Sequence, residues 1–180
     1  MARRSLDGHA HTSDDSTRVT MPSARAVIGL ISDTQGRVRP HVSEVSSAVD
    51  CTVHAGDVGG AAVLRALSAI APVHAVSGNV DDRHDPSLPR VRTLEVGGRS
   101  LHVSHGDELG SPTPNALLAR YGADILVYGH THRALWFRAP DGRVGVNPGA
   151  AGPPRFNLKP SVAILDITGG LVDVRFIDLG

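Results

Sequence analysis

Cysteine and long apolar runs are nearly absent from this sequence. Cys51 is the one cysteine in 180 residues, so no intrachain disulfide can form and a reducing compartment is the natural expectation. No apolar run approaches the roughly 18 residues that a membrane helix requires, and the N-terminus carries no apolar signal core. We therefore expect a cytoplasmic protein with no membrane partner.

Net charge and aromatic side chains are the next deficits. Lys and Arg total 18, Asp and Glu also total 18, and the formal net charge is zero with His neutral. One Trp, two Tyr and three Phe are too few for a platform on which bases stack. Because tight nucleic-acid binding depends on positive charge, these two deficits argue against a nucleic-acid partner.

The length suits a single domain with a sizeable core, but composition sets one end of the chain apart. Residues 1–23 are rich in Ser, Asp, Arg, Thr and His and have almost no large apolar side chains. Such a segment cannot bury enough surface to fold, so we expect a disordered tail over residues 1–23. One domain is expected over residues 24–180, without internal repeats or a linker.

Five short apolar runs each end on a side chain that can coordinate a metal ion. The clearest is Ile125–Tyr128, which is stopped by Gly129 and followed by His130 and His132. Runs of this kind predict buried strands, and a glycine lets the backbone turn sharply where the strand ends. The four earlier runs end in Asp33, Asp57, Asn79 and His105.

These strand ends should converge in space, because open α/β sheets bind ligands beyond the carboxyl ends of their strands. Chance does not readily place two Asp, one Asn and three His there. Some of these residues have ordinary alternatives: an Asp after a strand can cap the next helix, and Asn79 can be a turn residue. His54, inside a strand, is expected to be a core histidine or a support for Asp57. Carboxylates, imidazoles and an amide, without thiolate, suit Mn, Fe, Co, Ni or Zn better than Ca.

The order of the elements predicts the architecture. The first half follows a β-α-β-α-β pattern, with helices beginning near Pro40 and Gly60, which implies parallel strands with helices on the faces. The second half follows a hairpin pattern, with one helix opened by Thr113 and Pro114. The expected hairpins join residues 91–96 to 99–104, 135–138 to 143–146, and 162–167 to 171–177. The pattern predicts an α/β fold of two stacked mixed β-sheets flanked by helices.

The motifs at these strand ends resemble, in order, those of the calcineurin-like metallophosphoesterases. The matching segments are Asp33-Thr34-Gln35-Gly36, Gly56-Asp57, Gly78-Asn79-Val80-Asp81, Ser104-His105-Gly106 and Gly129-His130-Thr131-His132, with Asn147-Pro148-Gly149 as a closing signature. The resemblance is to the small phosphodiesterase branch that includes the YfcE-type enzymes and the retromer scaffold subunit. It runs from about Val27 to Ile177 and implies a four-layer α-β-β-α sandwich.

Carried over position by position, the resemblance implies a two-metal site that hydrolyses a phosphodiester with a bridging hydroxide. The first ion would be held by Asp33 and His132, the second by Asn79, His105 and His130, and both by the bridging Asp57. Mn is the expected metal, with Fe, Co, Ni or Zn as alternatives. Two such ions, roughly 3.5–4 Å apart, can clamp the phosphate oxygens.

Two positions depart from the family's pattern. Gln35 stands where the family usually has His, and an amide oxygen is a poorer ligand for these metals than an imidazole nitrogen. Val80 stands where many members have a His that protonates the leaving group. The neighbouring Asp81 is the expected helper in catalysis, either by orienting Asn79 or by donating a proton.

The resulting prediction is a cytoplasmic phosphodiesterase with an open site and a small phosphodiester as substrate; a homo-oligomer is left open. The first alternative is a catalytically weak scaffold or protein-interaction module, because Gln35 and Val80 depart from the pattern. The second is a phosphomonoesterase or a nuclease. Neutral charge and scarce aromatics disfavour the nuclease, whereas nothing in the sequence excludes the monoesterase.

Overall fold

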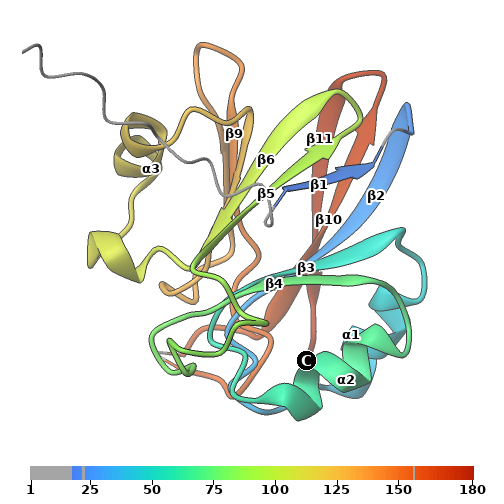
Figure 1. The fold of residues 1–180 in the computed structure, drawn as a ribbon, viewed down its shortest axis with the longest axis vertical. Coiled ribbons are helices and arrows are strands. Elements are labelled where there is room, and N and C mark those ends of the chain that lie inside the picture. Colours follow the sequence, from blue (N-terminus) through green and yellow to red (C-terminus); the bar gives the residue numbers. More distant parts are fainter. Residues whose placement is uncertain (1–17, 22, 156) are drawn as a thin grey trace, which may run out of the picture.

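The computed structural model describes residues 18–21, 23–155 and 157–180. Within this part of the chain the strands form two mixed sheets, one of five strands and one of six (Figure 1). No helix in the described part is both long enough and apolar enough to cross a membrane.

The five-stranded sheet contains the predicted β-α-β-α-β unit. Its parallel strands are β2 (Arg25–Ile31), β3 (Cys51–Ala55) and β4 (Val73–Val76). They are connected by α1 (Pro40–Ser46), whose first residue is proline, and by α2 (Ala61–Ser68). The predicted hairpin of β10 (Ser161–Thr168) and β11 (Leu171–Asp178) pairs with β2, so the strand order is β11-β10-β2-β3-β4.

The six-stranded sheet has the order β1-β5-β6-β7-β9-β8. Its strands are β1 (Arg18–Met21), β5 (Val91–Val96), β6 (Arg99–Ser104), β7 (Ile125–Val127), β8 (Leu135–Arg138) and β9 (Val144–Asn147). The pairs β5–β6 and β8–β9 are the predicted hairpins. Between β6 and β7 the chain forms α3 (Pro114–Arg120), which Thr113 caps by accepting a hydrogen bond from the Ala116 amide at 3.3 Å.

Three apolar clusters hold the layers together. The largest lies between the sheets and includes Leu30 from β2 and Leu101 from β6. A second packs α1 and α2 on the outer face of the five-stranded sheet, and a third packs α3 on the outer face of the six-stranded sheet (Figure 1). Their helix residues are Val42, Val63 and Leu67 in the second cluster and Leu117 in the third. The layer order is therefore α-β-β-α, as predicted.

Strand β1 lies inside the segment that the sequence predicted to be disordered. It pairs in parallel with β5, with Val19 opposite Leu94, and both Val19 and Met21 pack against the cluster between the sheets. So short a strand is stable here because it pairs along its whole length with β5 and packs two of its four side chains against the core. Arg18–Met21 therefore belong to the folded domain, which corrects the predicted boundary. Residues 1–17 and 22 of the expected tail lie outside the described residues.

Candidate metal centre

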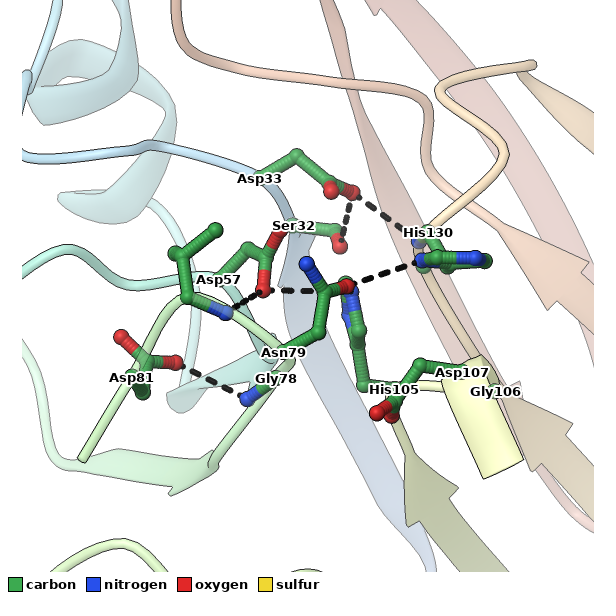
Figure 2. A network of polar contacts seen from close by, with 12 residues as sticks. Ser32, Asp33, Asp57, Gly78, Asn79, Asp81, His105, Gly106, Asp107 and His130 are labelled. Atoms are coloured by element: carbon green, nitrogen blue, oxygen red, sulfur yellow. Dashed lines mark hydrogen bonds and ion pairs between the residues drawn. The ribbon is translucent and has the colours of Figure 1, made fainter. Parts of the chain in front are cut away.

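The predicted ligands all lie in loops that follow the carboxyl ends of strands from the two sheets. Figure 2 shows five of them gathered in one place: Asp33, Asp57, Asn79, His105 and His130. Each strand ends with a buried residue and is followed by a loop, so the side chain that carries the chemistry leaves the sheet at a fixed point. Loops after the five-stranded sheet carry Asp33, Asp57 and Asn79, and loops after the six-stranded sheet carry His105, His130 and His132.

The backbone at these positions has a conformation that side chains rarely adopt. Among the described residues, six non-glycine residues have positive φ, and five of them are predicted site residues. These are Asp33 (54°), Gln35 (48°), Asp57 (54°), His130 (68°) and His132 (58°). Such conformations cost of order 1–3 kcal/mol each and concentrate at functional sites. The loops are therefore shaped to aim side chains and not for greatest local stability.

His105 presents a ring nitrogen to two oxygen atoms. Its Nδ1 lies 2.8 Å from the Ala55 carbonyl, which can only accept a hydrogen bond, so the proton of a neutral ring is on Nδ1. The other nitrogen, Nε2, then carries a lone pair. It lies 3.3 Å from Asp57 Oδ1 and 3.2 Å from Asn79 Oδ1.

His130 is oriented in the same way. Its Nε2 lies 3.1 Å from the Gly110 carbonyl, so the proton of the neutral ring is on Nε2, and the bare Nδ1 lies 3.0 Å from Asn79 Oδ1. The lone pairs of His105 Nε2, His130 Nδ1, Asp57 Oδ1 and Asn79 Oδ1 therefore converge with no proton between them when both rings are neutral. A cation relieves this repulsion, so these residues fit a metal ion.

A second contact joins Asp33 to His132. Asp33 Oδ1 lies 3.2 Å from His132 Nε2, and both side chains are buried. Asp33 Oδ2 accepts hydrogen bonds from Ser32 Oγ at 2.5 Å and from the His130 amide at 3.2 Å. Ligand atoms of Asp33, Asp57 and His105 lie within 4.8 Å of one another, so Asp57 is within reach of both groups of contacts.

The electrostatics of this cluster favour positive charge at its centre. Burial alone raises the pKa of Asp57, but the contact with His105 and the hydrogen bond from the Val80 amide outweigh burial, so the pKa is lowered. Burial alone lowers the pKa of His105, but Asp57 and Asp33 outweigh it and raise the pKa. The same negative potential attracts either a proton or a metal ion to His105 Nε2.

Two glycines leave room for the convergence. A Cβ atom on Gly78 would overlap Asp57 Oδ1, and a Cβ atom on Gly129 would overlap Ser32 Oγ. The glycines that precede Asn79 and His130 are therefore required for space. This requirement explains why the two motifs have glycine at these positions.

Gln35 lies in the same loop as Asp33, with its amide donating to the Asp57 carbonyl at 2.9 Å. Its side-chain Nε2 is buried and has no hydrogen-bond partner among the described residues. A buried amide without a partner is costly. Because an amide exchanges its oxygen and nitrogen positions by rotation, Gln35 can turn an oxygen towards a bound ion.

The carboxylate of Asp81 is surrounded by hydrogen-bond donors, which does not suit a residue that must donate a proton. Its carboxylate accepts hydrogen bonds from the amides of Val58 at 3.0 Å, Gly59 at 2.8 Å and Gly78 at 2.9 Å. These bonds tie the loop that carries Asp57 to the loop that carries Asn79. Of the two roles predicted for Asp81, the geometry favours orienting Asn79, which it does through Gly78.

Several supporting residues were not predicted from sequence. Arg90 donates to Asp107 Oδ1 at 2.7 Å and to the Gly78 carbonyl at 3.4 Å, so it connects the loops of His105 and Asn79. These partners are distant in sequence, and no local signal pairs them. Asn147, which the closing signature did contain, donates to the Gly129 carbonyl at 2.8 Å and fixes the loop of His130.

His54 is a buried core histidine, which was one of the two predictions for it, and it also supports the site, although not through Asp57. Its Nε2 lies 2.9 Å from Thr34 Oγ1, and that hydroxyl donates to the Val58 carbonyl at 2.9 Å. Burial lowers the pKa of His54 to about 4, so the ring is neutral and donates to Thr34. His54 therefore holds the loop between Asp33 and Gln35, and its hydrogen bond goes to that loop and not to Asp57.

Comparison with known proteins gives the same family. The domain model of the calcineurin-like phosphoesterase superfamily matches residues 27–170. A probable metallophosphoesterase of Methanothermobacter thermautotrophicus is 34% identical over 166 residues, which cover 86% of this chain and 93% of the relative. Vps29 of Chaetomium thermophilum has a TM-score of 0.72 at 23% identity, covering 84% of this chain and 96% of that chain. Yfce, a phosphoesterase from E. coli, has a TM-score of 0.56 at 21% identity, covering 86% and 100%.

The chain belongs to the calcineurin-like phosphoesterase superfamily. The curated relative is described as a probable metallophosphoesterase, and the donor atoms assembled here fit a divalent metal. The two solved structures are too distant in sequence to add more than the fold, which they share. The resemblance and the fold predicted from the motifs are thus confirmed.

Proposed function

We propose that the chain is a metal-dependent phosphodiesterase, which adds water to a small phosphodiester and releases a phosphomonoester and an alcohol. The observation that carries the proposal is the convergence of lone pairs from Asp57, Asn79, His105 and His130. Membership of a phosphoesterase superfamily supports phosphate as the group acted upon.

The proposed centre holds two divalent ions. Asp33 and His132 would bind the first, with Gln35 as a further ligand, and Asn79, His105 and His130 would bind the second; Asp57 would bridge them. Carboxylate, amide and imidazole donors suit Mn, and also Fe, Co, Ni or Zn. When bound, such ions neutralise charge on the phosphate oxygens and make water a better nucleophile near neutral pH.

The chain's own residues keep the donor atoms in place before substrate arrives. The Ala55 and Gly110 carbonyls each fix one imidazole by its outer nitrogen. Asp81 fixes the loops of Asp57 and Asn79 through three backbone amides. Because these partners are already bound, little reorganisation is needed at the moment of reaction, which is how preorganised sites lower a barrier.

Val80 decides which leaving groups depart easily. Val80 is 51% exposed beside Asn79, and its side chain cannot give a proton. The P–O bond that breaks therefore leaves its electron pair on an oxygen that takes a proton from water. Leaving groups of low pKa, such as aryl alcohols, should react fastest.

Charge favours a diester over a monoester. A diester carries one negative charge, whereas a monoester carries almost two near pH 7. Among the described residues, the guanidinium of Arg90 hydrogen-bonds to the Gly78 carbonyl, in the loop that carries Asn79. Its charge is already neutralised by Asp107, whose Oδ1 lies 2.7 Å away. The second charge of a monoester would therefore gain little from Arg90.

The test is turnover of bis(4-nitrophenyl) phosphate and 4-nitrophenyl phosphate by chelated protein after addition of Mn, Fe, Co, Ni, Zn or Ca. We expect no turnover without metal, recovery with the transition metals but not Ca, and a higher kcat/KM for the diester. Activity that survives chelation would contradict metal dependence. Faster hydrolysis of the monoester would identify a phosphomonoesterase, and inactivity with every metal would favour the scaffold alternative.

A further inference from the structure

A cavity of about 530 Å³ opens beside the candidate metal centre. It shares His132 with the centre and is otherwise lined by residues to which no role has yet been given. Its volume lies within the range of small-molecule sites, about 300–1,000 Å³. The other lining residues are Arg133, Ala134, Leu158, Lys159, Ser161, Phe176 and Asp178.

The walls of the cavity are attached to the edges of both sheets. Ala134 directly precedes β8, the edge strand of the six-stranded sheet, and Phe176 lies on β11, the edge strand of the five-stranded sheet. These edges are joined, since Arg138 of β8 donates to the Val172 carbonyl of β11 at 3.0 Å. Phe176 also packs against the cluster between the sheets, so it offers a fixed apolar surface.

The charged side chains that line the cavity, Arg133, Lys159 and Asp178, give it a net charge of +1. Lys159 Nζ lies 3.2 Å from Asp178 Oδ2, so these two charges largely cancel. The guanidinium of Arg133 forms no ion pair or hydrogen bond with any residue that the structure describes, although its backbone amide contacts Thr131. An anionic group can therefore pair with Arg133 without displacing a partner.

We propose that this cavity binds the non-leaving arm of the phosphodiester and selects arms that combine an apolar body with an anionic end. The proposal rests on the proposed function, because the arm reaches the cavity past His132 only when the phosphate lies at the metal centre. Phe176 packs against the apolar body, and Arg133 pairs with the anion. The substrate class is thus a phosphodiester with an aromatic or aliphatic arm that carries a carboxylate or a second phosphate.

Three diesters with the same 4-nitrophenoxide leaving group test this selection, with methyl, phenyl or 4-carboxyphenyl as the other arm. We expect kcat/KM to rise about tenfold from methyl to phenyl, because the ring buries apolar area, and several-fold more with the carboxylate. Arg133→Gln should remove the second increase, and Phe176→Leu should reduce the first. The matched control is Arg175→Gln, since Arg175 is an exposed arginine of β11 that does not line the cavity; both increases should remain.

Binding of uncleavable ligands gives a readout that does not depend on turnover. In calorimetry on Mn-loaded protein, 4-carboxybenzylphosphonate should bind several-fold more tightly than benzylphosphonate, and Arg133→Gln should abolish the difference. Equal affinities in wild type, or a difference that survives Arg133→Gln, overturn the proposal. If all three diesters are turned over at the same rate, the proposed role of the cavity is wrong, but the proposed phosphodiesterase activity stands. Selective binding without turnover of any diester supports the cavity and overturns the phosphodiesterase.

Discussion

The two sheets contribute different chemistry to one site. The oxygen donors follow strands of the five-stranded sheet, and the imidazoles follow strands of the six-stranded sheet. The oxygen donors are Asp33, Asp57 and Asn79, and the imidazoles belong to His105, His130 and His132. Because the mixed set of donors requires both sheets, the site is complete only when the sheets have stacked.

The two halves are also held in different ways. The oxygen-bearing loops are joined by their backbones: the Asp33 amide donates to the Gly56 carbonyl at 3.0 Å, and the Gln35 amide donates to the Asp57 carbonyl at 2.9 Å. The imidazoles of His105 and His130 are each held by a carbonyl that contacts the ring. The oxygen half therefore keeps its loop shape when a ligand side chain is replaced, which makes it suitable for substitutions that alter chemistry without unfolding the protein.

Asp57→Asn should have the largest effect, because Asp57 lies between the two halves. An amide cannot neutralise two cations, so metal content should fall and kcat/KM should fall by about 10³-fold or more. The fold should survive, since the new Asn can still accept the hydrogen bond that Val80 now donates to Asp57 at 3.1 Å. Metal analysis, kinetics and circular dichroism check this, with the exposed Asp173→Asn as control. Full activity with full metal content would contradict the bridging role.

Val80→His places an imidazole directly after Asn79, where it can protonate the leaving group. For diesters with poorly leaving alcohols the rate should rise roughly 10²-fold, because a positioned acid contributes about 10²–10⁴-fold. Rates plotted against leaving-group pKa should give a flatter line than wild type. Val80→Leu supplies the control for bulk without an acid. If the two lines have the same slope, protonation comes from elsewhere or bond cleavage does not limit the rate.

Gln35→His should strengthen the first metal site by adding the imidazole that the family's pattern usually has there. The metal concentration that gives half-maximal activity should fall by about tenfold. Even the loss of a residue that only hydrogen-bonds to a metal ligand lowers metal affinity about 10–100-fold. Bound metal per chain should rise from nearer one ion towards two. Gln35→Met, which is of similar length and lacks the amide, should bind metal no better than wild type. Equal ion content and equal metal titrations in wild type and Gln35→His would show that Gln35 is already an adequate ligand.

The smallest expected effect concerns His102, a histidine inside the six-stranded sheet that affects folding stability and not metal binding. His102 is 7% exposed, its ring stacks on Tyr121 with centroids 3.8 Å apart, and burial lowers its pKa from 6.5 to about 4. Between these values the unfolded chain binds a proton that the folded protein does not. The folding stability should therefore fall as the pH drops from 6.5 towards 4, by about 3 kcal/mol from this residue.

His102→Phe tests this contribution because it keeps the stacked ring and removes the titration. The variant should lose less stability than wild type over the same pH range in chelator-treated protein, and it should be at least as stable at pH 7, since it removes a buried nitrogen that lacks a hydrogen-bond partner among the described residues. Urea unfolding at pH 4.5 and 7 measures both effects. The exposed His84→Phe should leave the pH dependence unchanged. Parallel pH curves for His102→Phe and wild type would contradict the assignment.

The positions of the donor residues were predictable because strand ends are visible in sequence. An apolar run followed by glycine or serine and then by Asp or His marks both the strand and the point where the chain leaves the sheet. This pattern located Asp33, Asp57 and His130. Which atom of each side chain faces inward was not predictable. That depends on φ values and on carbonyls such as those of Ala55 and Gly110, which come from other loops.

Contacts that depend on how the sheets stack were also beyond the sequence. Arg90 and Asp107 are separated by 17 residues, and both lie outside the motifs that were matched. Asp81 was recognised, but three backbone amides from two loops decide its role, and none of them is visible in a sequence pattern. β1 was missed because so short a strand, within a largely polar segment, depends on pairing with its neighbour β5.

Strand β1 has a consequence for how copies of the protein behave towards one another. The family match begins at residue 27, and a protein trimmed to that point would lose β1 and leave β5 as a bare edge. Exposed edges pair with other chains and promote aggregation. Strand β1 is itself an edge strand, but with four residues against the six of β5 it leaves a shorter edge open to pairing. Trimmed protein should associate more as its concentration rises, which light scattering beside the full-length chain would show.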